Sequence, residues 1–191
     1  HRQPDGTFVE LRPLTPGTAG DTVVDRHRVP GHAVEGIWMA FAAMDLIGDH
    51  RHRDDLLASI PALCAAAWDL EHGGLLRYAD ASGPVRPTGR NTGTPYEDLV
   101  LRTWDTKLWW VHSETAVTTM IAAERYGHAA SREWLLRVWD YLITTFPGGD
   151  EGEEWIQIRD RAGRPLDQVV GLPVKDPFHV TRNLMQLVEL R

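Results

Sequence analysis

Residues 30–48 read PGHAVEGIWMAFAAMDLIG. This stretch is the clearest guide to the fold, because it carries the start signal, the stop signal and the apolar spacing of an amphipathic helix. Its apolar side chains recur at helical spacing, and they are Val34, Ile37, Trp38, Phe41, Met44, Leu46 and Ile47. Proline is tolerated in the first turn of a helix and glycine often follows the last turn, so Pro30 and Gly48 mark the two ends. We therefore predict a helix over residues 30–48.

The same spacing predicts further helices along the chain, at residues 54–70, 106–126, 131–146 and 178–190. Asp54 or Asp55 is expected to cap the first of these and Ser131 the third, because a side-chain oxygen can accept a hydrogen bond from the first turn. Pro61 lies inside the first of them and indicates either a kink or two shorter helices.

Four of these helices form two pairs, each joined by a short connection: 30–48 with 54–70, and 106–126 with 131–146. Short connections are typical of antiparallel αα-hairpins. In each pair the first helix carries the unusual polar residues, whereas its partner has the composition of ordinary core and surface. The pattern predicts an all-α domain with an inner helix layer that faces a central cavity and an outer layer around it.

The segments between the helices carry short β-prone runs, at residues 7–11, 22–24, 75–80, 155–158 and 165–170. The turn residues 160–163 between the last two runs predict a small β-hairpin. Residues 81–98 are rich in Gly, Pro, Thr and Arg and are predicted to be a long loop, of the kind that often forms a lid or binding loop.

Composition limits the class of protein. The 191 residues correspond to a single domain, 1–191, and the 42% apolar content is enough for a core. A net charge of −7 gives no basic field, so no nucleic acid and no membrane partner is expected. The sequence has no apolar run of ~18 residues and no signal-peptide pattern. Cys64, the single cysteine, cannot form an internal disulfide, and we expect a cytoplasmic protein.

His32 and Glu35 lie three residues apart on the first predicted helix and therefore share a face, and Trp38 continues the stripe. A carboxylate beside an imidazole fixes its orientation and tautomer and raises its basicity. Histidine can take and give a proton near neutral pH, which makes His32 a candidate acid/base group. The alternative is a polar pair at a helix start, with Glu35 interacting with the helix dipole.

The third predicted helix begins with a cluster of aromatic and polar residues, Trp109, Trp110, His112 and Glu114. Tryptophan is a common platform for sugar rings, and nearby carboxylate and imidazole groups can bind hydroxyls. The alternative is that both tryptophans pack in the core. At the last predicted helix, His179 and Arg182 place an imidazole and a cation together, where the alternative is a capping histidine with a surface arginine.

Metal and hydrolase chemistry are the other interpretations of these residues. His32, Glu35 and Glu114 could mimic part of a carboxylate–histidine metal site, but there is no second His-x-x-Glu and no cysteine pair, so we expect no metal and no cofactor. Glu35 and Glu114 could instead flank a glycosidic bond, as the two carboxylates of a glycosidase do.

Four motifs occur in a fixed order along the chain: Pro30-Gly31-His32-x-x-Glu35-x-x-Trp38, Lys107-x-Trp109-Trp110-x-His112-x-Glu114, Gly152-Glu153-Glu154-Trp155 and Phe178-His179-x-x-Arg182 after Lys175. Together with Asp69-x-x-x-Gly73-Gly74 they resemble the C-terminal half of the N-acylglucosamine 2-epimerase family, which includes renin-binding protein, cellobiose 2-epimerase and mannose and sulfosugar isomerases. The resemblance covers nearly all of residues 22–191.

The resemblance implies an (α/α)₆ barrel of helical hairpins, with small β-hairpins in its loops, of which about half of the ring is present. It implies that His32 and His179 are the two catalytic histidines and that Glu35 is the partner of His32. Trp38, Trp110 and Glu114 would line the sugar pocket, with Arg182 nearby. The implied reaction is proton abstraction next to the carbonyl of an open-chain sugar, such as an N-acylglucosamine, N-acylmannosamine, mannose, glucose or fructose.

The first half of the barrel has no counterpart in this sequence. We expect that the chain is a fragment with a missing N-terminal half, or that another chain completes the ring as a homo-oligomer. A non-catalytic module that binds a carbohydrate or a protein is the alternative that the half ring leaves open.

Overall fold

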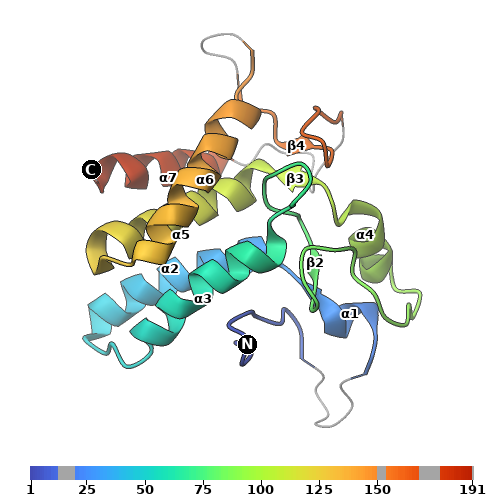
Figure 1. Cartoon of the computed structure of the whole chain (residues 1–191), viewed down its shortest axis with the longest axis horizontal. Coiled ribbons are helices and arrows are strands. Elements are labelled where there is room, and N and C mark those ends of the chain that lie inside the picture. Colours follow the sequence, from blue (N-terminus) through green and yellow to red (C-terminus); the bar gives the residue numbers. More distant parts are fainter. Residues whose placement is uncertain (13–19, 150–153, 168–176, 191) are drawn as a thin grey trace.

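The computed structural model describes residues 1–12, 20–149, 154–167 and 177–190, and helices dominate this part of the chain (Figure 1). The long helices are α2 (Pro30–Ile47), α3 (Arg53–Ala67), α5 (Trp109–Tyr126), α6 (Ala129–Thr145) and α7 (Pro177–Glu189). The short helices are α1 (Val23–Arg26) and α4 (Pro95–Thr103). The strands are β1 (His27–Arg28), β2 (Ala79–Asp80), β3 (Lys107–Leu108) and β4 (Ile158–Arg159). Among the helices of these ranges, none has the length and apolar character needed to cross a membrane.

The long helices form two layers. α2 and α3 make one hairpin and α5 and α6 make the other, and α5 also packs against α2 and α7. In Figure 1, α3 and α6 lie in the nearer layer, with α2, α5 and α7 behind them. α2 and α5 therefore lie in one layer, as the pairing of the predicted helices indicates, and α7 lies in the same layer.

Helix α2 forms where its apolar spacing predicts it. Pro30 occupies the first turn, and Gly48 ends the helix in the left-handed conformation (φ 69°), where its N–H donates to the carbonyl of Met44. The face that carries Val34, Ile37 and Phe41 is almost completely buried in the core. Burial of such a side chain contributes about 1.5–3 kcal/mol, so this stripe fixes which face of α2 turns toward α3 and α5.

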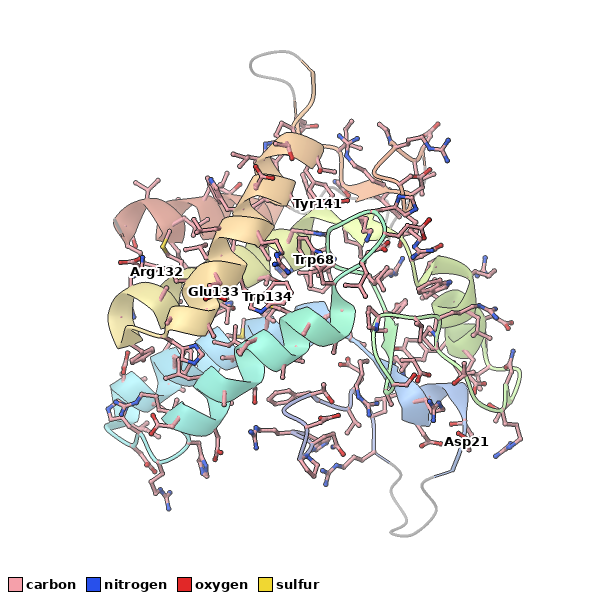
Figure 2. The ribbon with its side chains drawn as sticks, viewed as in Figure 1. Asp21, Trp68, Arg132, Glu133, Trp134 and Tyr141 are labelled. Carbon is pink, nitrogen blue, oxygen red and sulfur yellow. The ribbon has the colours of Figure 1, made fainter. Side chains whose placement is uncertain are left out.

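Aromatic side chains join the outer helices where α3 ends (Figure 2). The Trp68 ring meets the ring of Trp134 at 5.6 Å and the ring of Tyr141 at 6.0 Å, both edge to face. Edge-to-face pairs at such distances add about 0.5–1.5 kcal/mol beyond the area that they bury. Part of the high tryptophan content therefore serves the contact between α3 and α6.

Helix boundaries differ from the predicted ones by a few residues. α3 begins after His52 rather than at an aspartate cap, continues through Pro61 without a break, and ends at Ala67 rather than at residue 70. α6 begins after His128, and the Ser131 hydroxyl hydrogen-bonds to the Nδ1 atom of His128 at 2.8 Å instead of capping the helix. α5 begins at Trp109 because the two preceding residues pair as strand β3.

The loop predicted over residues 81–98 is wrong at its C-terminal end, where α4 begins at Pro95. Thr94 and Glu97 form a capping box, in which each side chain accepts a hydrogen bond from the backbone N–H of the other residue. Residues 22–24 do not form a strand either, because Thr22 and Asp25 make a second capping box that begins α1.

The remaining β elements are shorter than predicted. Residues 7–11 contribute one bridge, between Arg2 and Phe8, and residues 75–80 contribute β2, which pairs with β1. The hairpin turn around residues 160–163 is confirmed by the bridge between Arg159 and Pro165 and by a hydrogen bond from the Gly163 N–H to the carbonyl of Asp160. Residues 168–170 of the last predicted run lie outside the described residues, as do Gly152, Glu153 and Lys175.

A buried ion cluster ties the loop after α3 to strand β3 and to the turn that follows β4. The Asp69 carboxylate accepts hydrogen bonds from Lys107 Nζ at 3.0 Å and from Arg161 Nε at 2.9 Å. Lys107 Nζ also donates to the carbonyl of Gly73 at 2.7 Å. The side chains of Asp69 and Lys107 are both completely buried. The cluster therefore holds three segments that are far apart in the sequence.

Candidate active site

The Glu114 carboxylate is the centre of a polar cluster in the inner layer. This side chain of α5 is completely buried, and its Oε2 atom accepts a hydrogen bond from Trp38 Nε1 at 2.7 Å. Its Oε1 atom accepts from His179 Nδ1 at 2.7 Å and from Arg182 Nη2. Three inner helices, α2, α5 and α7, thus each supply a member of one network. The structure brings together four of the residues that the sequence singled out.

The contact with Glu114 fixes the tautomer of His179. A carboxylate can only accept hydrogen bonds, so the Nδ1 atom of His179 carries a proton. In the neutral imidazole the Nε2 atom is then the one that can take up a proton. A buried carboxylate that faces Nδ1–H also stabilises the positive charge that the ring acquires when it does so. His179 therefore has the setting of a general base.

The Glu35 carboxylate lies near the cluster of Glu114, His179 and Arg182. Its Oε1 atom lies 3.8 Å from His179 Nδ1 and 3.8 Å from Arg182 Nη2. Burial raises the pKa of Glu35, and the neighbouring Glu114 carboxylate raises it further, while His179 and Arg182 act in the opposite direction. The His32 imidazole also acts to lower the pKa of Glu35, so the partnership of Glu35 with His32 stays a prediction, while His179 and Arg182 lie near the same carboxylate.

His32 has a different carboxylate partner, Glu10. The His32 Nδ1 atom lies 2.8 Å from the Glu10 Oε1 atom, and both side chains are partly open to solvent. Glu10 precedes α1 in a segment without regular secondary structure. Sequence reasoning missed it because a contact across 22 residues leaves no helical or strand spacing to follow.

The Trp110 indole contacts the imidazole rings of both His32 and His179. Its ring centroid is 5.4 Å from that of His32, with planes at 31°, and 5.2 Å from that of His179, with planes at 34°. The centroids of the two imidazole rings are therefore no farther apart than the sum of these two centroid distances. Both predicted catalytic histidines thus contact one aromatic side chain, and Trp110 is only partly buried.

A cavity of about 300 Å³ lies on the His32 side of this aromatic contact. Its lining residues come from five parts of the chain and are Glu10, Val29, His32, Arg77, Tyr78, Tyr96, Leu108 and Trp110. Tyr96, at the start of the helix that the sequence prediction missed, is held by its contact with His27 Nε2 at 2.9 Å. The His27 Nδ1 atom donates to the carbonyl of Val24 at 2.7 Å, so Nε2 accepts the Tyr96 proton and the phenol oxygen keeps an accepting lone pair.

Two predicted sugar-binding residues, His112 and Trp109, belong instead to the core. His112 is completely buried, its Nδ1 atom donates to the carbonyl of Leu108 at 2.7 Å, and its Nε2 atom accepts from the Leu75 N–H at 2.8 Å. Burial lowers the pKa of His112 to about 3, which keeps it neutral. Trp109 is 8% exposed and packs in the main apolar cluster. For these two residues the core interpretation replaces the predicted role, because α5 is buried on nearly all sides.

Glu35, Glu114 and His179 could also be interpreted as metal ligands, since their ligating atoms lie within 4.8 Å of one another. The Arg182 guanidinium, however, already contacts Glu114 and lies 3.8 Å from Glu35. It also lies over the rings of Trp38 and Phe178, at 5.0 Å and 4.3 Å. Arginine keeps its positive charge in proteins, so the cation of this cluster is a side chain.

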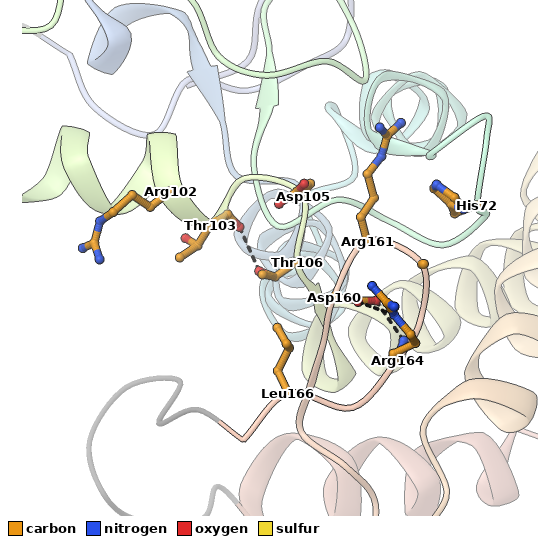
Figure 3. Close-up of a pocket in the computed structure, with 10 residues that line it drawn as sticks. His72, Arg102, Thr103, Asp105, Thr106, Asp160, Arg161, Arg164 and Leu166 are labelled. Carbon is orange, nitrogen blue, oxygen red and sulfur yellow. Dashed lines mark hydrogen bonds and ion pairs between the residues drawn. The ribbon is translucent and has the colours of Figure 1, made fainter.

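A larger cavity, of about 540 Å³, lies away from this cluster beside β4 (Figure 3). None of the predicted site residues lines it. Its charged side chains are largely paired, since Arg164 contacts Asp160 at 2.7 Å and Arg161 contacts Asp69. We therefore assign the candidate active site to the histidine cluster rather than to the larger cavity.

Gly31 permits the close approach of Trp110, and this can be tested. A Cβ atom at position 31 would lie 2.6 Å from the Trp110 ring, whereas a Cβ atom at Gly36 would meet nothing within 4 Å. We expect Gly31→Ala to destabilise the protein by about 1–3 kcal/mol through overpacking and to shift the indole. Gly36→Ala is the matched control on the same helix and should stabilise by about 0.4–1 kcal/mol. Urea unfolding followed by tryptophan fluorescence measures both, and equal effects would contradict the prediction.

Comparison of the sequence with known proteins identifies a family of similar proteins. Residues 12–181 match the profile of N-acylglucosamine 2-epimerase (GlcNAc 2-epimerase). The N-acylglucosamine 2-epimerase of Bos taurus is 31% identical over 166 residues, which are 86% of this chain and 36% of that protein. The human N-acylglucosamine 2-epimerase is 27% identical over 191 residues, which are 100% of this chain and 42% of that protein. The chain thus spans about two fifths of the length of these relatives.

Solved structures show the same arrangement of helices. A sugar epimerase from a ruminal bacterium matches with a TM-score of 0.71 and 20% identity, over 97% of this chain and 42% of that chain. A D-mannose isomerase matches with a TM-score of 0.64 and 15% identity, over 85% and 38%. The predicted fold, helical hairpins that form about half of an (α/α)₆ barrel, is thereby confirmed. The profile match and the relatives together show that the chain belongs to the N-acylglucosamine 2-epimerase family.

Proposed function

We propose that this chain is part of a sugar epimerase or isomerase in which His32 and His179 are the general acid and base. The observation that carries the proposal is that two imidazoles contact one indole, Trp110, and that each imidazole has a carboxylate at its Nδ1 atom. Such pairs can exchange protons near neutral pH without a cofactor. The substrate class is an open-chain sugar, of the N-acylglucosamine or N-acylmannosamine type or the mannose, glucose and fructose type.

The proposed reaction begins with the removal of the C2 proton next to the sugar carbonyl. One imidazole Nε2 atom takes this proton, and the electron pair of the C–H bond forms the C1–C2 double bond of an enolate or enediolate. Return of a proton to C2 from the opposite face gives the 2-epimer. Delivery of a proton to C1, with a proton shift from O2 to O1, gives the ketose.

The residues around His179 suit this reaction. Arg182 holds a positive charge beside the imidazole and can stabilise the oxygen that becomes negative in the enolate. Glu114 orients His179, and Trp38 is in turn held by Glu114, so three side chains are fixed before a substrate arrives. Trp110, which is only partly buried, supplies an aromatic face of the kind on which sugar rings pack.

The glycosidase interpretation is disfavoured by the setting of Glu114. This carboxylate is completely buried and accepts hydrogen bonds from three side chains, so neither oxygen is placed to attack or protonate a glycosidic bond. A reaction that needs two exposed carboxylates does not fit the pair of Glu35 and Glu114.

Exposed apolar side chains on α2 and α7 favour a larger assembly around the half ring. Met39 of α2 and Phe178, Met185 and Val188 of α7 are exposed, although they lie on inner-layer helices. We infer that further helices, from the same polypeptide or from a second copy, complete the ring. The same exposed side chains favour the second candidate function, a binding module without turnover. A cytoplasmic location remains part of the proposal.

Exchange of the C2 proton with solvent separates the two candidates. The protein, expressed from its complete reading frame, is incubated in D₂O with N-acetylglucosamine, N-acetylmannosamine, mannose or glucose, and the products are followed by proton NMR. We expect loss of the C2 proton signal for at least one sugar, with deuterium in the epimer or at C1 of a ketose. Binding of a sugar with no exchange for any of them would favour the binding module.

A further inference from the structure

We propose that Glu10 is the positioning residue of His32, a role that rests on the proposed function of His32 as acid or base. The Glu10 Oε1 atom lies 2.8 Å from the His32 Nδ1 atom. Because a carboxylate only accepts hydrogen bonds, the Nδ1 atom carries the proton and the Nε2 atom is left to exchange protons with the sugar. Glu10 would thus select the reactive tautomer of His32 without touching the substrate.

The two histidines that contact Trp110 then have equivalent partners. His179 donates from Nδ1 to Glu114 at 2.7 Å, and His32 makes the corresponding contact with Glu10 at 2.8 Å. Each ring centroid lies between 5.2 and 5.4 Å from the indole. If both rings exchange protons at Nε2, the base is the neutral ring with its proton on Nδ1 and the acid is the ring protonated on both nitrogens, and a carboxylate acceptor at Nδ1 suits both states.

Glu10 is held in place by the segment that carries it. The Val9 N–H donates to the carbonyl of His1 at 3.1 Å, and Phe8 packs against the main apolar core. Arg2 Nε donates to the Ser59 hydroxyl on α3 at 2.7 Å. These contacts anchor the segment against α3 and the core, so the Glu10 carboxylate reaches the start of α2 from a fixed backbone.

The setting of Glu10 differs from that of Glu114 in one respect, its exposure. The Glu10 side chain is 29% exposed and that of His32 is 52% exposed, whereas Glu114 is completely buried. Solvent screens the charge of an exposed carboxylate. The main contribution of Glu10 is therefore the hydrogen bond that fixes the ring, and the charge is secondary.

Two variants separate the hydrogen bond from the charge. Glu10→Gln keeps an oxygen that can accept from Nδ1–H, whereas Glu10→Ala removes the acceptor. We expect Glu10→Ala to lower kcat about tenfold to a hundredfold, as the loss of a group that orients a functional histidine does elsewhere, with KM changed less than about twofold. Glu10→Gln should retain several times the activity of Glu10→Ala. Asp45→Asn, which removes a carboxylate 3.8 Å from His50 at the other end of α2, is the control and should keep the wild-type kcat.

The tautomer of His32 gives a readout that does not depend on turnover. Long-range proton–nitrogen NMR spectra of ¹⁵N-labelled protein, with the His32 signals assigned by a His32→Asn variant, should show a protonated Nδ1 in the wild type and a mixture of tautomers in Glu10→Ala. Absence of exchange on every sugar, with this spectrum as expected, would reject the proposed function and keep the Glu10 contact. Full kcat and an unchanged His32 tautomer in Glu10→Ala would overturn the role of Glu10.

Discussion

His179→Asn is expected to lower the rate of C2 proton exchange by about 10²–10⁴-fold, the range that a positioned general acid or base supplies. The Nδ1–H of His179 donates to the buried Glu114 carboxylate at 2.7 Å. An asparagine side chain can place its amide N–H near the same point, so the carboxylate keeps a donor. The substitution removes Nε2 and with it the atom that takes the proton. Exchange in D₂O, followed by proton NMR, measures the loss.

The control for this variant is a histidine outside the cluster. His50 follows α2 and lies 3.8 Å from the carboxylate of Asp45, far along the helix from His32. His50→Asn should exchange the C2 proton at the wild-type rate. Thermal unfolding of both variants shows whether the fold is kept, since we expect His179→Asn to unfold within a few degrees of the wild type. If His179→Asn exchanged as fast as His50→Asn, the assignment of His179 as acid or base would be rejected.

Local spacing predicted the helices that position the site. The apolar stripe of α2 and the glycine after it placed that helix within one residue of its observed end. Helix α4 was missed because composition alone misled the prediction. The capping box of Thr94 and Glu97 lies in a stretch whose glycines, prolines and threonines favour a loop. A capping box is a local signal, so this error could have been avoided from the sequence.

Other features of the site depend on contacts between distant segments. Helical spacing predicts that Glu35 lies beside His32, yet the structure also places the Glu35 carboxylate 3.8 Å from His179 and Arg182 of α7, and the carboxylate hydrogen-bonded to His32 comes from Glu10. Likewise the buried Nε2 atom of His112 is satisfied by a hydrogen bond from the Leu75 N–H, 37 residues earlier in the chain. Helical spacing predicts which residues share a helix face, but the residues that this face contacts depend on how the helices pack.

Asp69→Asn is expected to destabilise the protein by about 3–5 kcal/mol, the cost of breaking a buried ion pair by removing one partner. The substitution leaves the Lys107 ammonium completely buried with carbonyl oxygens as its remaining partners. It also removes the charge that Arg161 contacts. Urea unfolding gives the free energy of unfolding, provided that the slope against urea is unchanged.

The exposed pair of Asp160 and Arg164 supplies the matched control. Its atoms lie 2.7 Å apart, closer than those of Asp69 and Lys107, but the Arg164 side chain is 81% exposed. Asp160→Asn should therefore cost no more than about 1 kcal/mol. The substitution is the same and the geometry of the pair is at least as good, so the comparison sets a buried cluster with two charged partners against a single pair at the surface. A cost for Asp69→Asn no larger than that for Asp160→Asn would contradict the structural role of the cluster.

The dependence on pH gives an independent test of the same cluster. Burial acts to raise the pKa of Asp69, but the hydrogen bonds and charges of Arg161 and Lys107 outweigh it and hold the pKa below its ordinary value of 3.8. The unfolded state therefore binds a proton at Asp69 more readily than the folded state does. The stability that Asp69 contributes is fully present above its ordinary pKa of 3.8 and is lost as the pH falls through its lower folded pKa. The stability difference between the wild type and Asp69→Asn should accordingly shrink below about pH 4. A difference that stayed constant down to about pH 3 would show that the charge of Asp69 is not what holds the three segments together.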